Sequence, residues 1–362
     1  MVKISNIEIK NFRNFSNYRA SFDNKVNILY GENGSGKTNI LEGISLISKG
    51  RGIRNANIHN LIKKKEDNFF IKNDLQIQKN NFDIEISTEY KNNKYKKVVK
   101  INNDISKDSI DFLNQSLSYL IFVPEMERLF QSSPSYRRNF LDRLIFSSIN
   151  NYNRLINKYK KLLIERVKIL QNQNIDNDWL NNIEKEIGKI GLEIYQLRSS
   201  QINYINNNLN ILKNDHKFQF NVELKIKDNF FNKEINFDTY LKNLYNFRIY
   251  DKHNGGTKIG PHRSDFTSII NDDFDGSLLS TGQQKTVVLM ILLAQCNYLV
   301  ESKSINPILL LDEIGSHLDI QNRQILLDMI NRFDIQFFLT GTDKNLFSFV
   351  STNAQFYNIT HI

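Results

Sequence analysis

The sequence has very little cysteine or proline, and it has no long apolar run. Cys296 is the one cysteine in 362 residues, so no disulfide can form within the chain, and a reducing compartment such as the cytoplasm is expected. Four prolines and no low-complexity segment leave no extended linker, so we expect packed lobes. No run of eighteen apolar residues occurs and the first residues already alternate like a strand, so we expect neither a membrane span nor a signal peptide.

The chain also lacks zinc-ligand spacing, a recognition-helix pattern and a basic motif interleaved with aromatic residues, so base-specific reading of nucleic acid is not expected. Its formal net charge of +9 suits a nucleic-acid binder. However, lysine, asparagine and isoleucine are abundant throughout, which also fits a genome-wide bias. Either solvated faces or phosphate contacts explain the basic clusters, which are Lys63–Lys65, Lys94, Lys96, Lys97, Lys100, Arg137 and Arg138.

A glycine-rich segment, Gly31–Thr38, matches the phosphate-loop pattern G-x-x-x-x-G-K-[ST] in full. An apolar run precedes it and apolar residues at helical spacing follow it, which is the strand–loop–helix context that the motif requires. Lys37 is expected to reach the β- and γ-phosphates, and the Thr38 hydroxyl to ligate Mg²⁺. The sequence therefore predicts a site for ATP and Mg²⁺ lined by Gly31, Glu32, Asn33, Gly34, Ser35, Gly36, Lys37 and Thr38.

A second motif, Ile308–Glu313, is an apolar strand that ends in two carboxylates. We expect Asp312 to hold the Mg²⁺ together with Thr38, directly or through water, as the Walker-B aspartate does. Glu313 is expected to polarise an attacking water, which makes it the catalytic candidate together with Lys37. The alternative is a core strand followed by an acidic helix cap, and the phosphate loop in the same chain favours the metal site.

A third motif, Leu278–Thr286, precedes an apolar segment that we expect to be a helix over residues 287–300. It resembles the L-S-x-G-Q signature of ABC-type ATPases. A serine hydroxyl, a glycine N–H and a helix N-terminus together form an anion site. The resemblance implies that Ser280, Gly282 and Gln283 meet the γ-phosphate of ATP bound to a second protomer. The alternative is an ordinary N-capped amphipathic helix after a glycine turn.

Two further segments resemble parts of these ATPases. Ser316–Asp319 resembles the D-loop, which crosses the same dimer interface and places Asp319 among the nucleotide-site residues. The N-terminal segment ends in Phe-Arg-Asn and resembles the opening of the SMC and RecF group, which implies that Arg13 lies near the nucleotide. Three other polar residues are further candidates for this neighbourhood: Glu125, His317 and Thr342.

More specific segments resemble the RecF family of bacterial recombinational-repair ATPases. They are Gly50–Arg54, Pro134–Asp142 and Gly260–Asp265, and Pro124-Glu125 accompanies them. The phosphate loop and the signature are common to the whole superfamily, whereas the Tyr-Arg-Arg-x-Phe-Leu-Asp and Gly-Pro-His-Arg stretches are the specific ones. The resemblance extends from Ile4 to the region around Asp343, which is nearly the whole chain.

The resemblance implies an α/β fold: an ABC-type phosphate-loop ATPase head, with a mixed sheet, flanking helices and an antiparallel β part, joined to a mainly helical second lobe. It implies an ATP-binding switch that forms a homodimer on ATP, hydrolyses ATP weakly in a DNA-linked manner and has no other catalytic activity. The implied DNA is single-stranded, gapped or a junction, without base specificity. The implied partners are RecR and RecO, with which the protein would help to load RecA in replication restart and the SOS response.

We expect the ATPase lobe at residues 1–105 and 260–362, the helical lobe at 106–259, and the signature segment 278–286 at their junction. Antiparallel strands are expected at 68–77, 82–90 and 98–101, and another strand at 218–226. Apolar residues recur at helical spacing over 152–170 and again over 183–212, with a polar break at 171–178 between them. This pattern predicts a short helical hairpin whose second helix has about 35 residues.

Two other kinds of ABC-type ATPase remain as alternatives. An SMC-type head would carry hundreds of heptad residues between the phosphate loop and the signature, whereas this chain has only residues 39–277 there. A motor subunit of a membrane transporter would be shorter and would open with a stacking aromatic near the phosphate loop. The Phe-Arg-Asn opening, the helical insertion and the Gly-Pro-His-Arg stretch oppose that second alternative.

Overall fold

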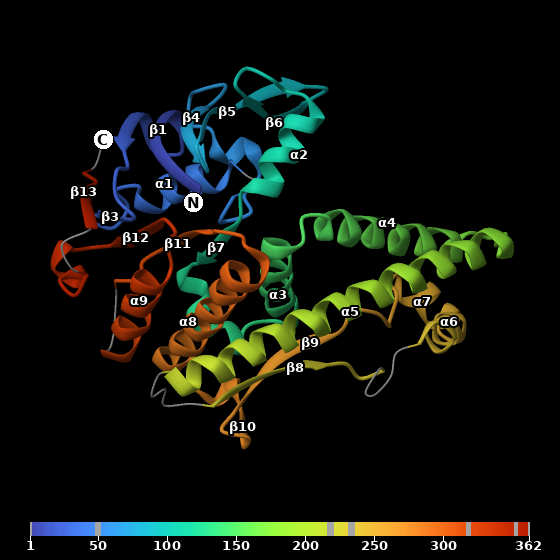
Figure 1. Cartoon of the computed structure of the whole chain (residues 1–362). Coiled ribbons are helices and arrows are strands. Elements are labelled where there is room, and N and C mark those ends of the chain that lie inside the picture. Colours follow the sequence, from blue (N-terminus) through green and yellow to red (C-terminus); the bar gives the residue numbers. More distant parts are fainter. Residues whose placement is uncertain are drawn as a thin grey trace. The chain divides into compact units, whose positions relative to one another are not determined.

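The computed structural model describes residues 2–47, 52–215, 221–230, 236–315, 320–350 and 354–360 (Figure 1). The chain forms two compact units: unit 1 comprises residues 1–127 and 288–362, and unit 2 comprises residues 128–287. The functional lobe boundaries expected near residues 105 and 260 stay a prediction. None of the helices in the described ranges is long and apolar enough to cross a membrane.

Unit 1 is built on a five-stranded parallel sheet of order β13-β3-β12-β11-β7. Its central strands are apolar along their whole length, as expected for parallel strands that are buried on both faces. Strands and helices of this part are β3 (Val26–Tyr30), α1 (Lys37–Ser45), α2 (Lys107–Ser116), β7 (Tyr119–Phe122), β11 (Ile308–Leu311), α9 (Ile320–Arg332), β12 (Phe337–Gly341) and β13 (Ala354–Asn358).

A separate antiparallel sheet completes unit 1, in the order β2-β1-β4-β5-β6. Its strands are β1 (Val2–Phe12), β2 (Phe15–Ser21), β4 (Phe70–Ile77), β5 (Asn80–Lys91) and β6 (Lys94–Ile101). The three antiparallel strands expected at 68–101 are confirmed. Strands β5 and β6 extend further than expected because Asn92 and Asn93, both with φ above 50°, make a tight two-residue hairpin turn.

Buried contacts join the two sheets of unit 1. The Gln336 side chain is fully buried and its amide exchanges two hydrogen bonds with the backbone of Ile4, at 2.8 and 2.9 Å. Helix α1 approaches the antiparallel sheet at Gly43, where an added Cβ would lie 3.4 Å from Ile9 and 3.5 Å from Ile71. The helix that follows the phosphate loop is therefore fixed by the antiparallel strands.

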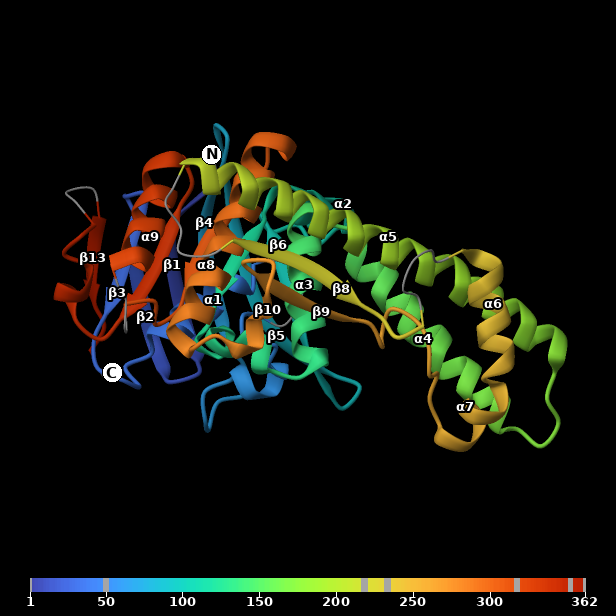
Figure 2. The same ribbon diagram turned by 90° about the horizontal axis from the view of Figure 1, so that it is seen from below.

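Unit 2 contains a helical pair and a three-stranded antiparallel sheet of order β10-β9-β8. Helices α4 and α5 run side by side, and β8 follows α5 (Figure 1; Figure 2). The predicted helical hairpin is confirmed, with a second helix of 39 residues. Its elements are α3 (Pro134–Ser148), α4 (Tyr152–Gln171), α5 (Asn177–Asp215), β8 (Val222–Lys227), α6 (Phe237–Asn246), α7 (Arg248–Asn254), β9 (Asp265–Ile270), β10 (Phe274–Asp275) and the start of α8 (Thr281–Asn297).

Short helical turns connect these elements. They are η1 (Ile58–Leu61), η2 (Pro124–Gln131), η3 (Gly276–Leu278), the π-helix η4 (Tyr298–Ser302) and η5 (Lys344–Phe347). Helix α8 is buried on all sides over residues 287–297, so it is a core helix and not the amphipathic helix of the alternative interpretation. Cys296 is fully buried in α8, and burial raises the pKa of its thiol, as expected for a core residue.

Buried arginines hold unit 2 together. The Arg166 side chain is fully buried, and its guanidinium bonds Glu184 at 2.9 Å and Asp251 at 2.6 Å. Arg198 makes a bidentate pair with Asp142 at 2.9 and 3.0 Å. Because a buried charge without a partner is costly, these pairs require the helices that carry them to keep their mutual positions.

The two RecF-like stretches that are most specific lie against one another inside unit 2. Arg137 makes a bidentate pair with Asp265, at 2.8 and 2.5 Å, and Arg138 donates to the Ser264 carbonyl at 2.8 Å. These two arginines had been candidates for phosphate contacts. Their hydrogen bonds to the Gly260–Asp265 segment give them a structural role, and a phosphate contact by either one stays a prediction.

His262, in the Gly260–Asp265 segment, contacts Tyr159 of helix α4 and the backbone of Thr257. Its Nε2 donates to the Thr257 carbonyl at 2.8 Å, so Nδ1 accepts from the Tyr159 hydroxyl at 3.0 Å. The Tyr159 hydroxyl also pairs with that of Tyr240 at 2.8 Å. Burial, aided by nearby arginines, lowers the pKa of His262 from 6.5 to about 4, so its ring is neutral at pH 7.

This histidine predicts a pH-dependent stability. Because the folded pKa of about 4 lies below the unfolded value of 6.5, the unfolded chain binds more protons between these values, and stability is lost as the pH falls from 6.5 towards 4. The full loss from this group is about 3 kcal/mol. Urea unfolding of the wild type and of His262→Gln at pH 7.5 and pH 5 should show a smaller loss in the variant. The exposed His253→Gln is the control, and equal losses in all three proteins would contradict the prediction.

Candidate nucleotide-binding site

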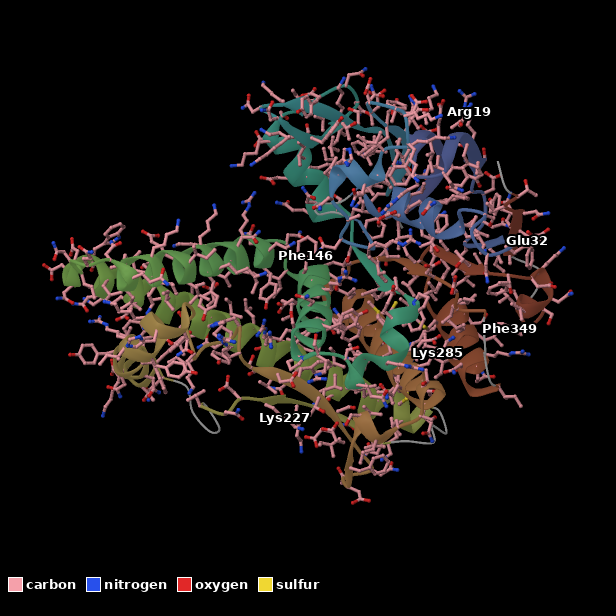
Figure 3. The ribbon with its side chains drawn as sticks, turned by 180° about the vertical axis from the view of Figure 1, so that it is seen from behind. Arg19, Glu32, Phe146, Lys227, Lys285 and Phe349 are labelled. Atoms are coloured by element: carbon pink, nitrogen blue, oxygen red, sulfur yellow. The ribbon has the colours of Figure 1, made fainter. Side chains whose placement is uncertain are left out.

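The phosphate loop lies between β3 and α1, as the sequence predicted. Two of its glycines have positive φ and close neighbours. An added Cβ would come within 2.2 Å of the Ile359 carbonyl at Gly31 (φ 151°), and within 2.5 Å of the Phe15 ring at Gly36 (φ 109°). The loop can follow this path only with glycine at both positions. Glu32, labelled in Figure 3, is exposed at the surface of the loop.

Lys37 lies inside this loop, with a relative exposure of 5%. Its ammonium group donates to the carbonyls of Gly31 and Glu32, at 2.8 Å each. Burial lowers its pKa, and the neighbouring carboxylates of Glu313 and Asp312 oppose that shift. An ammonium has three donors, so the loop occupies two of them while it holds the charge at its centre.

Asp312 follows β11, and its carboxylate accepts two side-chain hydrogen bonds. Its Oδ1 accepts from the Thr38 hydroxyl at 2.9 Å and from the Thr340 hydroxyl at 2.8 Å. The pKa of this carboxyl is raised overall, mainly by burial. The charge of Glu313 also raises it, and the two hydroxyl donors oppose the shift. The predicted metal ligands Thr38 and Asp312 are therefore neighbours, although 273 residues separate them in the sequence.

Sequence reasoning missed Thr340, whereas the candidate Thr342 is an exposed residue two positions further on. Strand β12 lies between β3 and β11 in the sheet. The end of β12 is therefore flanked by the strand that leads to the phosphate loop and the strand that leads to Asp312. The Thr340 hydroxyl also accepts from the backbone N–H of Glu313 at 2.7 Å. The signal in the sequence was a single hydroxyl at the end of the apolar run Phe337–Leu339.

Glu313 is partly exposed beyond the end of β11 and has a φ of +49°. A positive φ is uncommon for a residue with a long side chain, and such conformations concentrate at functional sites. The hydrogen bond from its N–H to Thr340 supports this conformation. The backbone therefore turns sharply between the metal-ligand candidate and the catalytic candidate.

Asn14 links the N-terminal hairpin to the phosphate loop. Its amide donates to the Ser35 carbonyl at 3.2 Å and accepts from the Asn39 amide at 2.7 Å. Sequence analysis had singled out Arg13 from this segment and had not given Asn14 a role. Asn14 is the residue of this segment that bonds directly to the loop backbone.

Arg13 bonds to helix α1. Its guanidinium makes a bidentate pair with the fully buried Glu42, at 2.8 and 2.9 Å, and donates to the Asn60 carbonyl at 2.8 Å. Arg54, which sequence analysis quoted without a role, donates to Asn39 at 2.9 Å, and its charge lowers the pKa of Asp312. The contact of Arg13 with nucleotide stays a prediction, and its observed partners give it a role in positioning α1.

The other end of α1 is also held. Lys97 donates to the Leu46 carbonyl at 3.0 Å, and the Tyr119 hydroxyl donates to the Ile44 carbonyl at 2.9 Å. A cation suits the negative end of the helix dipole. Burial lowers the pKa of Lys97 to about 8. Lys97 had been counted with the possible phosphate contacts, and this position gives it a structural role, whereas Lys94 and Lys96 are exposed.

These residues fit a nucleoside triphosphate with Mg²⁺. Mg²⁺ prefers a few oxygen ligands from the protein and takes others from phosphates, and Thr38 with Asp312 supplies two such oxygens. Within the described ranges no cluster of three or more His, Cys, Asp or Glu side chains forms a self-sufficient metal site. The Ser35 hydroxyl oxygen in the loop is buried and has no hydrogen-bond partner among the described residues. A bound phosphate would satisfy that hydroxyl.

The signature segment belongs to unit 2. Ser280 caps α8: its N–H donates to the Gln283 side chain at 3.0 Å, and its hydroxyl accepts from the Gln283 N–H at 3.3 Å. Gly282 is exposed, and a Cβ added there would meet nothing within 4 Å. The start of α8 thus presents a helix N-terminus and a glycine to solvent, as an anion site requires.

The structure leaves the roles of some predicted residues as predictions. The D-loop candidates Asp319 and His317 lie outside the described residues, as do Gly50 and Arg51 of the first RecF-like stretch. Glu125 is exposed in η2. The roles given to the three signature residues in a second protomer's site likewise stay predictions.

Comparison with known proteins decides the family. The family model of the RecF/RecN/SMC N-terminal domain matches residues 3–361. The DNA replication and repair protein RecF of Rickettsia massiliae is 34% identical over 355 residues, which cover 97% of this chain and 98% of that protein. The chain belongs to the RecF family.

Other family members agree. RecF of Rickettsia prowazekii is 35% identical over 357 residues, covering 97% of this chain and 98% of that protein. A solved structure of the recombination mediator protein RecF with ATP, in the RecFOR pathway, superposes with a TM-score of 0.86 at 27% identity, over 99% of this chain and 96% of that one. The predicted fold class, an ABC-like ATPase head with parallel and antiparallel sheets, is confirmed.

The similarity of this chain to SMC head domains is limited to the fold. The Smc head domain of Pyrococcus furiosus reaches a TM-score of 0.55 at 16% identity, over 100% of this chain and 94% of that one. Both values are well below those for RecF, which favours the RecF family over an SMC-like head among the interpretations that the sequence had left open.

The missed residue Thr340 offers a direct test of the site. Thr340→Val keeps the side-chain shape but removes the donor to Asp312 and the acceptor of the Glu313 N–H. We expect a loss of about 1–3 kcal/mol in unfolding free energy, because buried polar groups lose their partner, and weaker binding of ATP in the presence of Mg²⁺. Urea unfolding and nucleotide titration measure the two effects. The exposed Thr342→Val is the matched control, and identical behaviour of both variants would refute the role of Thr340.

Proposed function

We propose that this chain is an ATP-dependent DNA-binding clamp of recombinational repair. In this proposal it binds single-stranded, gapped or junction DNA, dimerises when ATP is bound, and acts with RecO and RecR to load RecA in replication restart and the SOS response. The observation that carries the proposal is the cluster of Thr38, Asp312 and Thr340 beside the phosphate loop, in a chain that resembles RecF over nearly its full length. The RecF–ATP structure supports ATP as the ligand.

Within one protomer, different residues bind the phosphates, hold the metal ion and activate the water. Lys37 and the loop N–H groups bind the phosphates, and Thr38 and Asp312 hold Mg²⁺. When bound, the ion neutralises the charge that develops on the phosphate oxygens. Glu313 accepts a hydrogen bond from the attacking water and then takes up its proton, and its place in the chain directly after Asp312 supports this role.

The proposed homodimer completes the site. Ser280, Gly282 and Gln283 of one protomer contact the γ-phosphate held by the other, and Asp319 lines the same interface. The exposed start of α8 supports this assignment, because a helix N-terminus favours negative charge.

Glu313→Gln should trap the ATP-bound dimer on DNA. The amide keeps the shape of the side chain but cannot accept a proton, so hydrolysis should fall about 100- to 10,000-fold while ATP still binds. Analytical sedimentation of the wild type and the variant, with and without ATP and a short gapped duplex, measures dimerisation and DNA retention together. We expect an ATP-dependent dimer that carries DNA and that is most persistent in the variant.

The control for this experiment is Glu301→Gln, which changes an exposed glutamate in η4 and should behave like the wild type. ATP binding without dimerisation, or dimers that are indifferent to DNA, would overturn the clamp. Such a result would leave a phosphate-loop ATPase whose partner is not nucleic acid.

Ser280→Arg tests the composite site separately. The long cationic side chain should block the approach of a second nucleotide-bound protomer, while ATP binding by each protomer stays near normal. Equilibrium nucleotide titration together with sedimentation distinguishes the two steps. Ser302→Arg, at an exposed serine outside the signature, is the control. ATP-induced dimerisation that survives intact in Ser280→Arg would refute the composite site.

A further inference from the structure

A surface hollow occurs in unit 2 where the loop after β8 meets α7. We call it the tip hollow, and its principal lining residues are Asp228, Phe230, Tyr250, Asn254, Lys258 and Arg263. Figure 1 shows α6 and α7 beside the α4–α5 pair, at the end of the pair where α5 begins. Its lining shares no residue with the nucleotide site described above, and the basic clusters of the sequence did not include its two cations.

Aromatic rings gather here and reach the solvent. Phe230 and Phe247 pack edge to face with ring centres 5.5 Å apart, and Phe247 lies 6.2 Å from Tyr250. Phe230 is 37% exposed and Tyr250 is 44% exposed. Large exposed aromatics grouped on one surface are a recognised mark of a binding site, because their apolar area gains free energy when it is covered.

Cations accompany these rings. The Lys258 ammonium lies 4.1 Å from the centre of the Tyr250 ring and 5.4 Å from that of Phe247. Arg263 is exposed, although its Nε donates to the Thr257 carbonyl at 3.1 Å. The acidic member, Asp228, accepts hydrogen bonds from the Tyr195 hydroxyl at 2.5 Å and from the Phe230 N–H at 2.9 Å.

The loop that carries Lys258 is fixed by the buried core. Gly255 ends α7 with a φ of +65°, and the Lys258 N–H then donates to Asp251 at 2.9 Å. The other oxygen of Asp251 accepts from the buried Arg166 at 2.6 Å. Tyr250 and Lys258 therefore lie on either side of a segment anchored to the core, which limits the entropy lost when a ligand binds.

We propose that the tip hollow binds an unpaired nucleotide of a single-stranded nucleic acid. The base takes the place that the Lys258 ammonium holds over the Tyr250 ring and also contacts Phe230, and Lys258 then moves, with Arg263, to the adjoining phosphate. A ring beside a cation suits a ligand that alternates flat bases with anionic groups, and such stacking is tolerant of sequence. A protein partner is the competing occupant. The proposal deepens the proposed function, on which it rests, by giving the single strand a contact made by residues that are not part of the nucleotide site.

The test measures the affinity of the full chain for a labelled oligothymidine of about 20 nucleotides, by fluorescence anisotropy without ATP. Tyr250→Ala should weaken binding roughly 5- to 150-fold, and Tyr250→Phe should restore it, because stacking requires the ring and not the hydroxyl. Lys258→Gln and Arg263→Gln should each reduce the slope of log affinity against log salt by about 0.7. Tyr204→Ala, also 44% exposed in unit 2, and Lys303→Gln are the matched controls.

Wild-type affinity in Tyr250→Ala, or an equal loss in Tyr204→Ala, would overturn the proposal and leave the hollow to a protein partner. Circular dichroism and ATP-dependent dimerisation of each variant exclude misfolding, and both should match the wild type. The proposed function has its own readout, because ATP-dependent retention of the gapped duplex by the wild type does not depend on this result. Failure of the tip hollow and failure of the clamp are thus separate outcomes.

Discussion

The site in unit 1 depends on one buried carboxylate. Asp312 loses its hydration in the core of the parallel sheet, and the hydroxyls of Thr38 and Thr340 replace part of it. This arrangement requires the carboxyl ends of β3, β12 and β11 to lie in register, because each strand leads to one of the three groups. The strand order thus has a chemical consequence: the middle strand supplies the Thr340 hydroxyl, which joins the Asp312 carboxylate to the backbone N–H of Glu313, while Thr38 joins the phosphate loop to Asp312.

Sequence alone predicted the family, the phosphate loop, the two carboxylates and the helical hairpin, because each depends on a local pattern of residue types. It missed Thr340 and Asn14, whose roles arise only when strands distant in sequence become neighbours. It also read Arg137 as a candidate phosphate contact, since an exposed arginine and one paired with Asp265 look alike in a sequence. Sequence alone also did not predict the tip hollow, because its rings come from separate segments of unit 2 that become neighbours only in the folded chain.

The contacts of unit 2 explain why its RecF-like stretches are rich in charged residues, because several of these residues pair with one another or with helix α5. Arg198 bonds Asp142 from one stretch and Ser264 from the other, so it couples both to helix α5. His262 stays neutral and joins the same core through Tyr159. Removing one member of such a network would leave a buried charge unpaired, which is far more costly than losing a surface ion pair.

Several arginines of this chain lie in surroundings different from those of its exposed lysines, and that difference bears on the proposed binding of DNA. Planar, multidentate arginines such as Arg13, Arg166 and Arg198 are used in internal pairs, where fixed geometry repays desolvation. Exposed lysines such as Lys94 supply much of the surface charge, and mobile point charges attract phosphates without selecting a base. In the proposed function, selectivity for unpaired strands would then come from another chemistry, and exposed aromatic rings such as Tyr250 are groups that can stack on a free base.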